Sequence, residues 1–121
     1  MSRFARIDLR PDHRRPVLDV LRANLPPRTK AWVFGSRATG RARRYSDLDL
    51  VIDAGRRLTV DESARLAEAF SDSDLPYRVD VVDWHAIDNR FRQVIAGERV
   101  PLAEASHPDA ALGADPGASA T

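Results

Sequence analysis

Apolar and polar positions in the first half of the chain predict one helix followed by two strands. Over residues 12–25, apolar side chains from Val17 to Leu25 recur at helical spacing, and a Pro-Pro pair ends the segment. The short apolar run at 31–34 stops at Gly35, which is typical of a buried strand. Residues 36–46 are mostly polar and predict a loop, with or without a helical turn, before a second strand at 48–52.

The second half continues with a helix, a strand and another helix. Thr59 and Glu62 form the pattern of a capping box and begin the first of these helices. Residues 77–82 predict a third strand, after which Asp83 is expected to cap a helix with an apolar stripe from Ile87 to Ile95 and an end at Gly97. A last short extended piece is expected at 99–102.

This order of elements predicts an α/β (α+β) domain, in which a small mixed β-sheet is flanked by helices. We expect the domain to span residues 1–102. Residues 103–121 consist mostly of Ala, Gly, Ser, Asp and Pro, so we expect them to form a disordered tail.

The composition narrows the class of protein. The 121 residues include no cysteine, which excludes disulfides and thiolate metal sites. The chain has no apolar run long enough to span a membrane, and its first residues lack the apolar segment of a signal peptide. We therefore expect no membrane association and a cytoplasmic location.

The net charge of +1 conceals a polarised chain. Residues 1–44 hold 12 Lys or Arg against three Asp, whereas residues 45–121 hold seven Arg against 15 Asp or Glu. Such asymmetry indicates either an anionic partner for the basic half or mutual neutralisation of the two halves in the fold.

Two carboxylates, Asp47 and Asp49, stand at the start of the second strand. Side chains alternate along a strand, so both point to the same face, about 6.5 Å apart. Carboxylates this close repel each other unless a cation joins them, and Mg²⁺ is typically held by one or two carboxylates together with substrate phosphates. Taken alone, the pair is more typical of two solvated acids at a strand edge.

A third acid, Asp80, lies among β-branched residues of the strand at 77–82. A carboxylate there is costly unless it is paired, hydrogen-bonded or bound to a metal. Asp80 is therefore our third candidate carboxylate, and an ion pair with a nearby arginine is the alternative. We interpret Asp53 as a turn residue.

The turn at Gly35-Ser36 is a candidate phosphate site. Gly35 allows close approach of the backbone, and Ser36 adds a hydroxyl and the first of several amides that can bind an anion. Four arginines follow without an intervening acid, and their planar donor groups suit phosphate oxygens. They are, in order, Arg37, Arg41, Arg43 and Arg44. A solvated basic loop, or one that meets RNA, is the alternative.

Together these residues resemble the nucleotidyltransferase superfamily of the DNA polymerase beta type. The resemblance rests on Gly-Ser, ten residues, Asp-x-Asp and a later lone Asp on a strand, and it covers about residues 12–102. The segments Phe34–Gly40 and Ser46–Leu50 are most similar to the minimal nucleotidyltransferases, the MNT group.

The resemblance implies a role for each motif residue. Gly35 and Ser36 would hold the triphosphate of ATP, with Arg37 and Arg41 as further contacts. Asp47, Asp49 and Asp80 would bind Mg²⁺, and Asp80 would also activate the attacking hydroxyl. The chemistry would be nucleotidyl transfer, in which that hydroxyl attacks the α-phosphorus and pyrophosphate leaves.

The resemblance also implies a partner, because many stand-alone MNT proteins are antitoxins of HEPN ribonuclease toxins. In such a pair, the MNT protein transfers AMP from ATP to a toxin tyrosine. Larger relatives carry an extra acceptor-binding domain, which we do not expect after residue 102. Three alternatives remain: an antitoxin that neutralises mainly by binding, a nucleotidyltransferase for an aminoglycoside-like small molecule, and an RNA-binding protein. We expect direct nucleic-acid binding least of these.

Overall fold

The computed structural model describes residues 7–102, and the tail expected at 103–121 lies outside the described residues. The elements are α1 (Pro11–Asn24), β1 (Lys30–Phe34), α2 (Ser36–Thr39), β2 (Leu48–Asp53), α3 (Val60–Ser71), β3 (Val79–Asp83), the 3-10 turn η1 (Trp84–Ala86), α4 (Asn89–Glu98) and β4 (Val100–Pro101). Except for η1, each lies where the sequence predicts an element. No helix within the described residues has the length and apolarity needed to cross a membrane.

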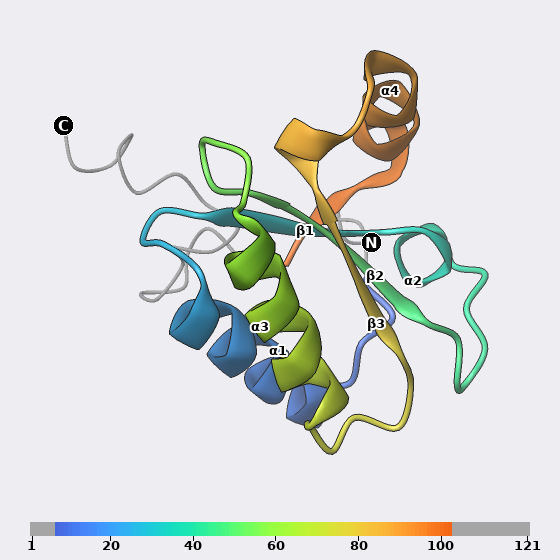
Figure 1. The fold of residues 1–121 in the computed structure, drawn as a ribbon. Helices are drawn as coiled ribbons and strands as arrows, with labels where there is room; N and C mark the ends of the chain where they lie inside the picture. Colours follow the sequence, from blue (N-terminus) through green and yellow to red (C-terminus); the bar gives the residue numbers. More distant parts are fainter. Residues whose placement is uncertain (1–6, 103–121) are drawn as a thin grey trace, which may run out of the picture.

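The four strands form one mixed sheet in the order β3-β2-β1-β4. Strand β1 pairs antiparallel with both β2 and β4, whereas β2 and β3 run parallel because α3 connects them as a crossover. Helices α1 and α3 lie side by side over one face of the sheet, and α4 projects on the far side (Figure 1). The predicted fold class, a small mixed sheet flanked by helices, is confirmed.

The main core fills the space between the sheet and the α1–α3 layer. Alternate residues of β2 point into it, and Leu48, Leu50 and Ile52 are fully buried there. They meet Leu21 of α1 and Leu66 of α3, which are also inaccessible to solvent. Each such side chain contributes about 1.5–3 kcal/mol by leaving water, so this face fixes the register of β2.

A second, smaller cluster lies on the opposite face of the sheet, under α4. Its buried members are Phe34, Val51 and Ile95. Trp32 and Trp84 pack against this cluster, and the Arg99 guanidinium lies over both indole rings, at 4.2 and 4.8 Å from their centroids. This cluster attaches the end of α4 to the sheet.

The capping box predicted for α3 is present. The Thr59 hydroxyl accepts from the Glu62 amide, while the Glu62 carboxylate accepts from the Thr59 amide. The prediction for α4 was wrong in detail: Asp83 caps η1, through the His85 amide, and Asp88 caps α4. The reason is the intervening 3-10 turn, which occupies the residues directly after β3. Helix α4 also continues through Gly97 to Glu98.

Candidate active site

The Gly35-Ser36 turn lies against Asp49, the first carboxylate within β2. Gly35 follows β1 with φ of 74°, in the region that favours glycine. A Cβ atom at this position would overlap Oδ2 of Asp49. Ser36 opens helix α2, whose first amides have no carbonyl partner within their own helix and are therefore suited to an anion. The candidate phosphate-binding turn at Gly35-Ser36 and the candidate metal ligand Asp49 are therefore adjacent.

The second and third strands bring two carboxylates into register. Asp49 of β2 is the direct neighbour of Asp80 on β3, and both alternate with residues of the main core, so they share the face opposite α1 and α3. Asp47 lies two residues before Asp49, just ahead of the strand, and is exposed. The three acids chosen from the sequence therefore gather at one corner of the sheet.

The electrostatics of Asp49 reflect this crowding. Burial raises the pKa of the Asp49 carboxyl above its ordinary value, and the charges of Asp80, Asp47 and Glu98 raise it further. An acid whose ionised form is disfavoured by several like charges gains most from a nearby cation. The donor set of hard carboxylate oxygens fits a divalent ion such as Mg²⁺.

The carboxylates are not arranged around a single point. Asp80 forms an ion pair with Arg78, 3.2 Å from Nε to Oδ1, and the Asp80 side chain is 39% exposed. Within residues 7–102, no three acidic or histidine side chains converge closely enough to hold a metal ion. The ion pair considered from the sequence is therefore present. If Asp80 were to hold a cation together with Asp47 and Asp49, it would have to release Arg78.

Glu98 is a fourth acid at this corner, and the sequence analysis did not identify it. It ends α4, far along the chain, yet its Oε1 accepts from the Gly35 amide at 2.7 Å. The position of Glu98 depends on the return of the chain into β4, where Val100 pairs with Val33. No local pattern reveals that neighbourhood.

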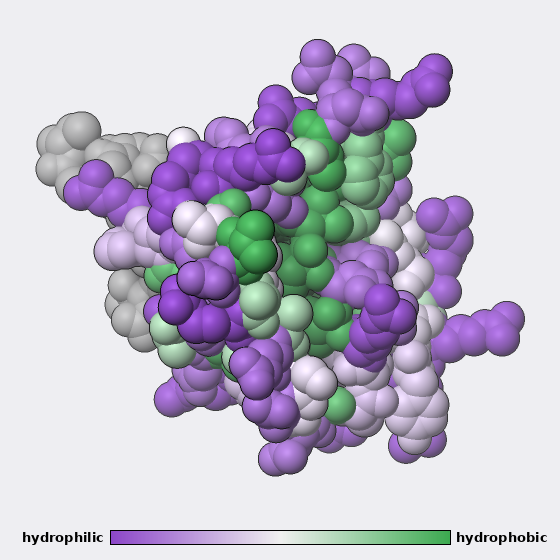
Figure 2. Space-filling model, in the orientation of Figure 1, coloured by the Kyte–Doolittle hydropathy of each residue, from purple (hydrophilic) through white to green (hydrophobic). Residues whose placement is uncertain are grey.

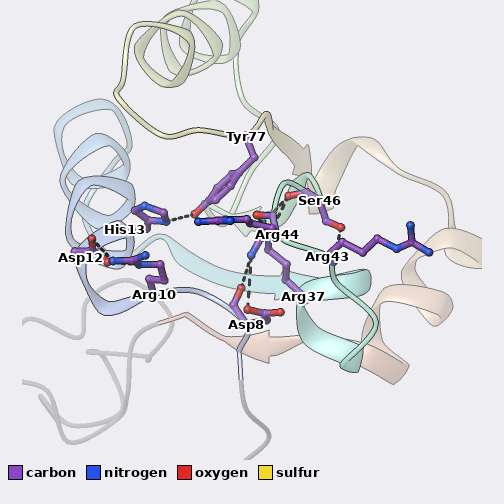
Figure 3. A network of polar contacts seen from close by, with 9 residues as sticks. All are labelled: Asp8, Arg10, Asp12, His13, Arg37, Arg43, Arg44, Ser46 and Tyr77. Atoms are coloured by element: carbon purple, nitrogen blue, oxygen red, sulfur yellow. Dashed lines mark hydrogen bonds and ion pairs between the residues drawn. The ribbon is translucent and has the colours of Figure 1, made fainter.

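Arg37 occupies a different place from the one expected of a phosphate contact. Its side chain is 5% exposed, and its guanidinium donates to the carbonyls of Asp8, Arg44 and Ser46 (Figure 3). Arg41, in contrast, is exposed on the same loop and donates to the Thr39 hydroxyl at 3.3 Å. Of the two predicted arginine contacts, only Arg41 is placed where a phosphate has access to it.

Asp53 was interpreted as a turn residue, but it is the last residue of β2 and is in register with Lys30; only its side chain takes part in the turn that follows. Its Oδ1 accepts from the Gly55 amide at 2.8 Å and contacts Nε2 of His85 at 2.6 Å. This pair lies at the end of β2 opposite the candidate active site. His85 therefore pairs with the end of β2, away from the candidate active site.

A cavity of about 210 Å³ lies between α3 and the edge strand β3. The residues that line it are Leu58, Ser63, Leu66, Ala67, Val79, Asp80, Val81 and Asp83. Apolar surface gathers around β3 and extends toward α4 (Figure 2). The cavity is smaller than the 300–1,000 Å³ typical of ligand sites, so we assign no ligand to it.

Comparison with known proteins identifies the same family that the sequence motif resembles. The model of the polymerase beta nucleotidyltransferase family matches residues 19–107. A relative in Haemophilus influenzae, described as a probable protein adenylyltransferase, MntA, is 41% identical over 104 residues, which make up 86% of this chain and 90% of that protein.

Two solved structures share the fold. A chain from a toxin–antitoxin crystal structure with AMP-PNP is 26% identical, with a TM-score of 0.65 over 80% of this chain and 77% of that one. A structure described as a minimal nucleotidyltransferase is 36% identical, with a TM-score of 0.55 over 74% of this chain and 89% of that one. With its Gly-Ser turn set against paired aspartates, the chain belongs to the polymerase beta nucleotidyltransferase family.

Proposed function

We propose that this protein is an Mg²⁺-dependent protein adenylyltransferase and the antitoxin of a toxin–antitoxin pair. It transfers AMP from ATP to a tyrosine of a HEPN-type toxin. The observation that carries the proposal is the contact between Gly35 and Asp49, which sets an anion-binding turn directly against a carboxylate cluster. The MntA relative of Haemophilus influenzae and the AMP-PNP-containing toxin–antitoxin structure support it.

The residues at this corner of the sheet have separate roles in the reaction. The amides at Ser36, together with Arg41, hold the triphosphate and offset its charge. Asp47, Asp49 and Asp80 hold the cation, which would neutralise charge on the phosphates and on the departing pyrophosphate. The arrangement thus provides positioning and charge stabilisation, the main needs of phosphoryl-group chemistry.

The bond changes are those of an in-line displacement. The acceptor oxygen attacks the α-phosphorus, the bond between that phosphorus and the bridging oxygen breaks, and pyrophosphate leaves with the bonding electrons. The hydroxyl proton passes to the Asp80 carboxylate. Since Asp80 is paired with Arg78, substrate binding would have to separate them.

The test is transfer of AMP to the co-purified toxin. The chain, its toxin, ATP and Mg²⁺ should give toxin with the added mass of AMP on a tyrosine-containing peptide. Asp47→Asn should abolish the added mass, while Glu68→Gln, an exposed acid on α3, should leave it unchanged.

Three other results would contradict the proposal. Unmodified toxin together with full neutralisation by Asp47→Asn would assign neutralisation to binding alone. Transfer to an aminoglycoside-like hydroxyl in place of the toxin would indicate a small-molecule enzyme. Transfer that persists undiminished after Mg²⁺ is removed with EDTA would exclude the proposed cation dependence.

A further inference from the structure

The guanidinium of Arg37 joins three segments that are distant in the sequence. Nη1 of Arg37 donates to the backbone carbonyl of Asp8, which precedes α1, at 2.8 Å. The distance from the same nitrogen to Oδ1 of the Asp8 carboxylate is 3.8 Å. The plane of the group lies over the Tyr77 ring, 4.2 Å from its centroid, and the Tyr77 hydroxyl contacts His13 of α1 at 3.0 Å. Figure 3 shows these groups converging on Arg37.

The third segment is the loop that enters β2. Nε and Nη2 of Arg37 both donate to the Ser46 carbonyl, at 3.0 and 2.8 Å, and Nη2 also donates to the Arg44 carbonyl at 3.1 Å. The Ser46 carbonyl belongs to the peptide bond that leads directly into Asp47. Two donors on one oxygen fix the orientation of that peptide and so the direction in which Asp47 leaves the loop.

These contacts use all three nitrogens of the guanidinium. The group is nearly inaccessible to solvent, and a phosphate would have to displace loop carbonyls to reach it. Arg41, four residues on, lies exposed on the same loop and makes one weak contact to a hydroxyl. The two arginines therefore differ in what they are able to touch.

We propose that Arg37 is a positioning residue for Asp47 and that it makes no contact with the triphosphate. The proposal rests on the proposed function, because it assigns a cause to the placement of one of its carboxylates. Arg37 acts through the Ser46 carbonyl, and Tyr77 supports the guanidinium from the other side.

The experiment separates phosphate contact from carboxylate positioning by measuring AMP-PNP binding with and without divalent cation. Calorimetry in EDTA reports contacts to the nucleotide alone, and calorimetry in Mg²⁺ adds the contribution of the carboxylates. Arg37→Met and Arg37→Lys are compared with Arg41→Met, the exposed counterpart. Tyr77→Leu removes support for the guanidinium without touching the loop carbonyls.

For Arg37→Met we expect unchanged affinity in EDTA, loss of the gain produced by Mg²⁺, and a fall in kcat of about tenfold or more. Arg37→Lys, which keeps a donor to the carbonyls, should recover part of kcat, and Tyr77→Leu should show a smaller defect of the same kind. Arg41→Met should weaken binding in EDTA.

Equal weakening in EDTA by Arg37→Lys and Arg41→Met would overturn the positioning role. If Arg37→Met does not fold, Arg37→Lys and Tyr77→Leu decide the question, and normal Mg²⁺ dependence in both contradicts the role. A wild-type chain that binds no AMP-PNP would instead contradict the proposed function.

A separate observation concerns the Gly35 amide. Its N–H points at the carboxylate of Glu98, 2.7 Å away, and Glu98 also lies close enough to raise the pKa of Asp49. A carboxylate bonded to an amide of an anion-binding turn occupies a donor that a phosphate oxygen would otherwise use. Glu98 is the last residue of α4, where the helix dipole does not favour an acid.

We infer that Glu98 and the triphosphate compete for the Gly35 amide. This also rests on the proposed function. Glu98→Gln keeps an oxygen acceptor but removes the charge, and it should lower the Kd for ATP in EDTA about fivefold or more, as expected for loss of one nearby like charge.

The matched control is Glu68→Gln, which changes net charge equally on the exposed side of α3 and should leave the Kd unchanged. An unchanged or raised Kd in Glu98→Gln would overturn the competition. An equal decrease of the Kd in Glu98→Gln and Glu68→Gln would assign the effect to net charge and would also contradict the competition.

Discussion

The Asp49 carboxylate occupies the space that a side chain on Gly35 would need, so a Cβ atom there would overlap Oδ2 of Asp49. This contact joins the end of β1 to the start of β2 at the candidate active site, across the pair Phe34 and Asp49. Substitution at Gly35 therefore tests both the backbone conformation and the position of the carboxylate.

Gly35→Ala should abolish nucleotidyl transfer and destabilise the fold by about 1–3 kcal/mol. The alanine backbone would have to adopt a positive φ, and its Cβ would displace the Asp49 carboxylate. Gly40→Ala is the matched control, since Gly40 has a similar φ of 81° but open space around it. Chemical unfolding and AMP transfer should show a stability loss in both variants and an activity loss only in Gly35→Ala. Full activity in Gly35→Ala would contradict the assigned site.

Asp49→Asn should raise the thermal stability of the metal-free protein while abolishing transfer. Burial, followed by the charges of three neighbouring acids, raises the pKa of the Asp49 carboxyl, so removal of its charge relieves both the desolvation and the repulsion. The gain should be small, because Asp49 is only partly buried and solvent screens the repulsion. Asp74→Asn, at an exposed loop position, should have little effect on either measurement, and a lower melting temperature for Asp49→Asn would argue against crowding of the acids.

Glu62 supplies a pH-dependent part of the stability. The side-chain hydrogen bond from Arg56, followed by that from the Thr59 amide, lowers the pKa of Glu62 from 4.5 to about 2. The ionised form is thus favoured by folding, and the contribution is present above pH 4.5 and lost as the pH falls toward 2. The stability difference between wild type and Glu62→Gln should shrink over this window. A difference that is constant with pH would refute the linkage.

Ile95 attaches α4 to the sheet, and its fully buried side chain belongs to the cluster with Phe34 and Val51. Ile95→Ala should cost about 2–5 kcal/mol in the free energy of unfolding. The neighbouring Val94 is 54% exposed, so Val94→Ala should cost less than about 0.5 kcal/mol. Similar losses in the two variants would indicate that α4 does not pack as described.

Local patterns were sufficient for most of the fold. The capping box at Thr59 and the apolar alternation of β2 are properties of consecutive residues, and both are present in the structure. Asp83 was assigned to the wrong helix because a single cap residue does not reveal whether a 3-10 turn intervenes. Propensity distinguishes a helix start from a strand, but it does not distinguish one tight turn from another.

The candidate site was predictable where the motif is local and unpredictable where the fold brings distant residues together. The motif from Gly35 to Asp49 was found through its resemblance to a known family, and the parallel pairing of β2 with β3 places Asp80 beside Asp49. The burial of Arg37 depends on Asp8 and Tyr77, which lie 29 and 40 positions away in the sequence. The alternation of apolar and polar residues gives no indication of such a neighbourhood.

The placement of Arg99 between Trp32 and Trp84 has an optical consequence. These are the two tryptophans of the chain, and both flank the residue that directly follows Glu98. Intrinsic fluorescence therefore reports on the junction at the end of α4 without any added label. Release of Glu98 from Gly35 by ATP should change the emission of the wild-type chain, whereas ATP binding to Glu98→Gln should change it less.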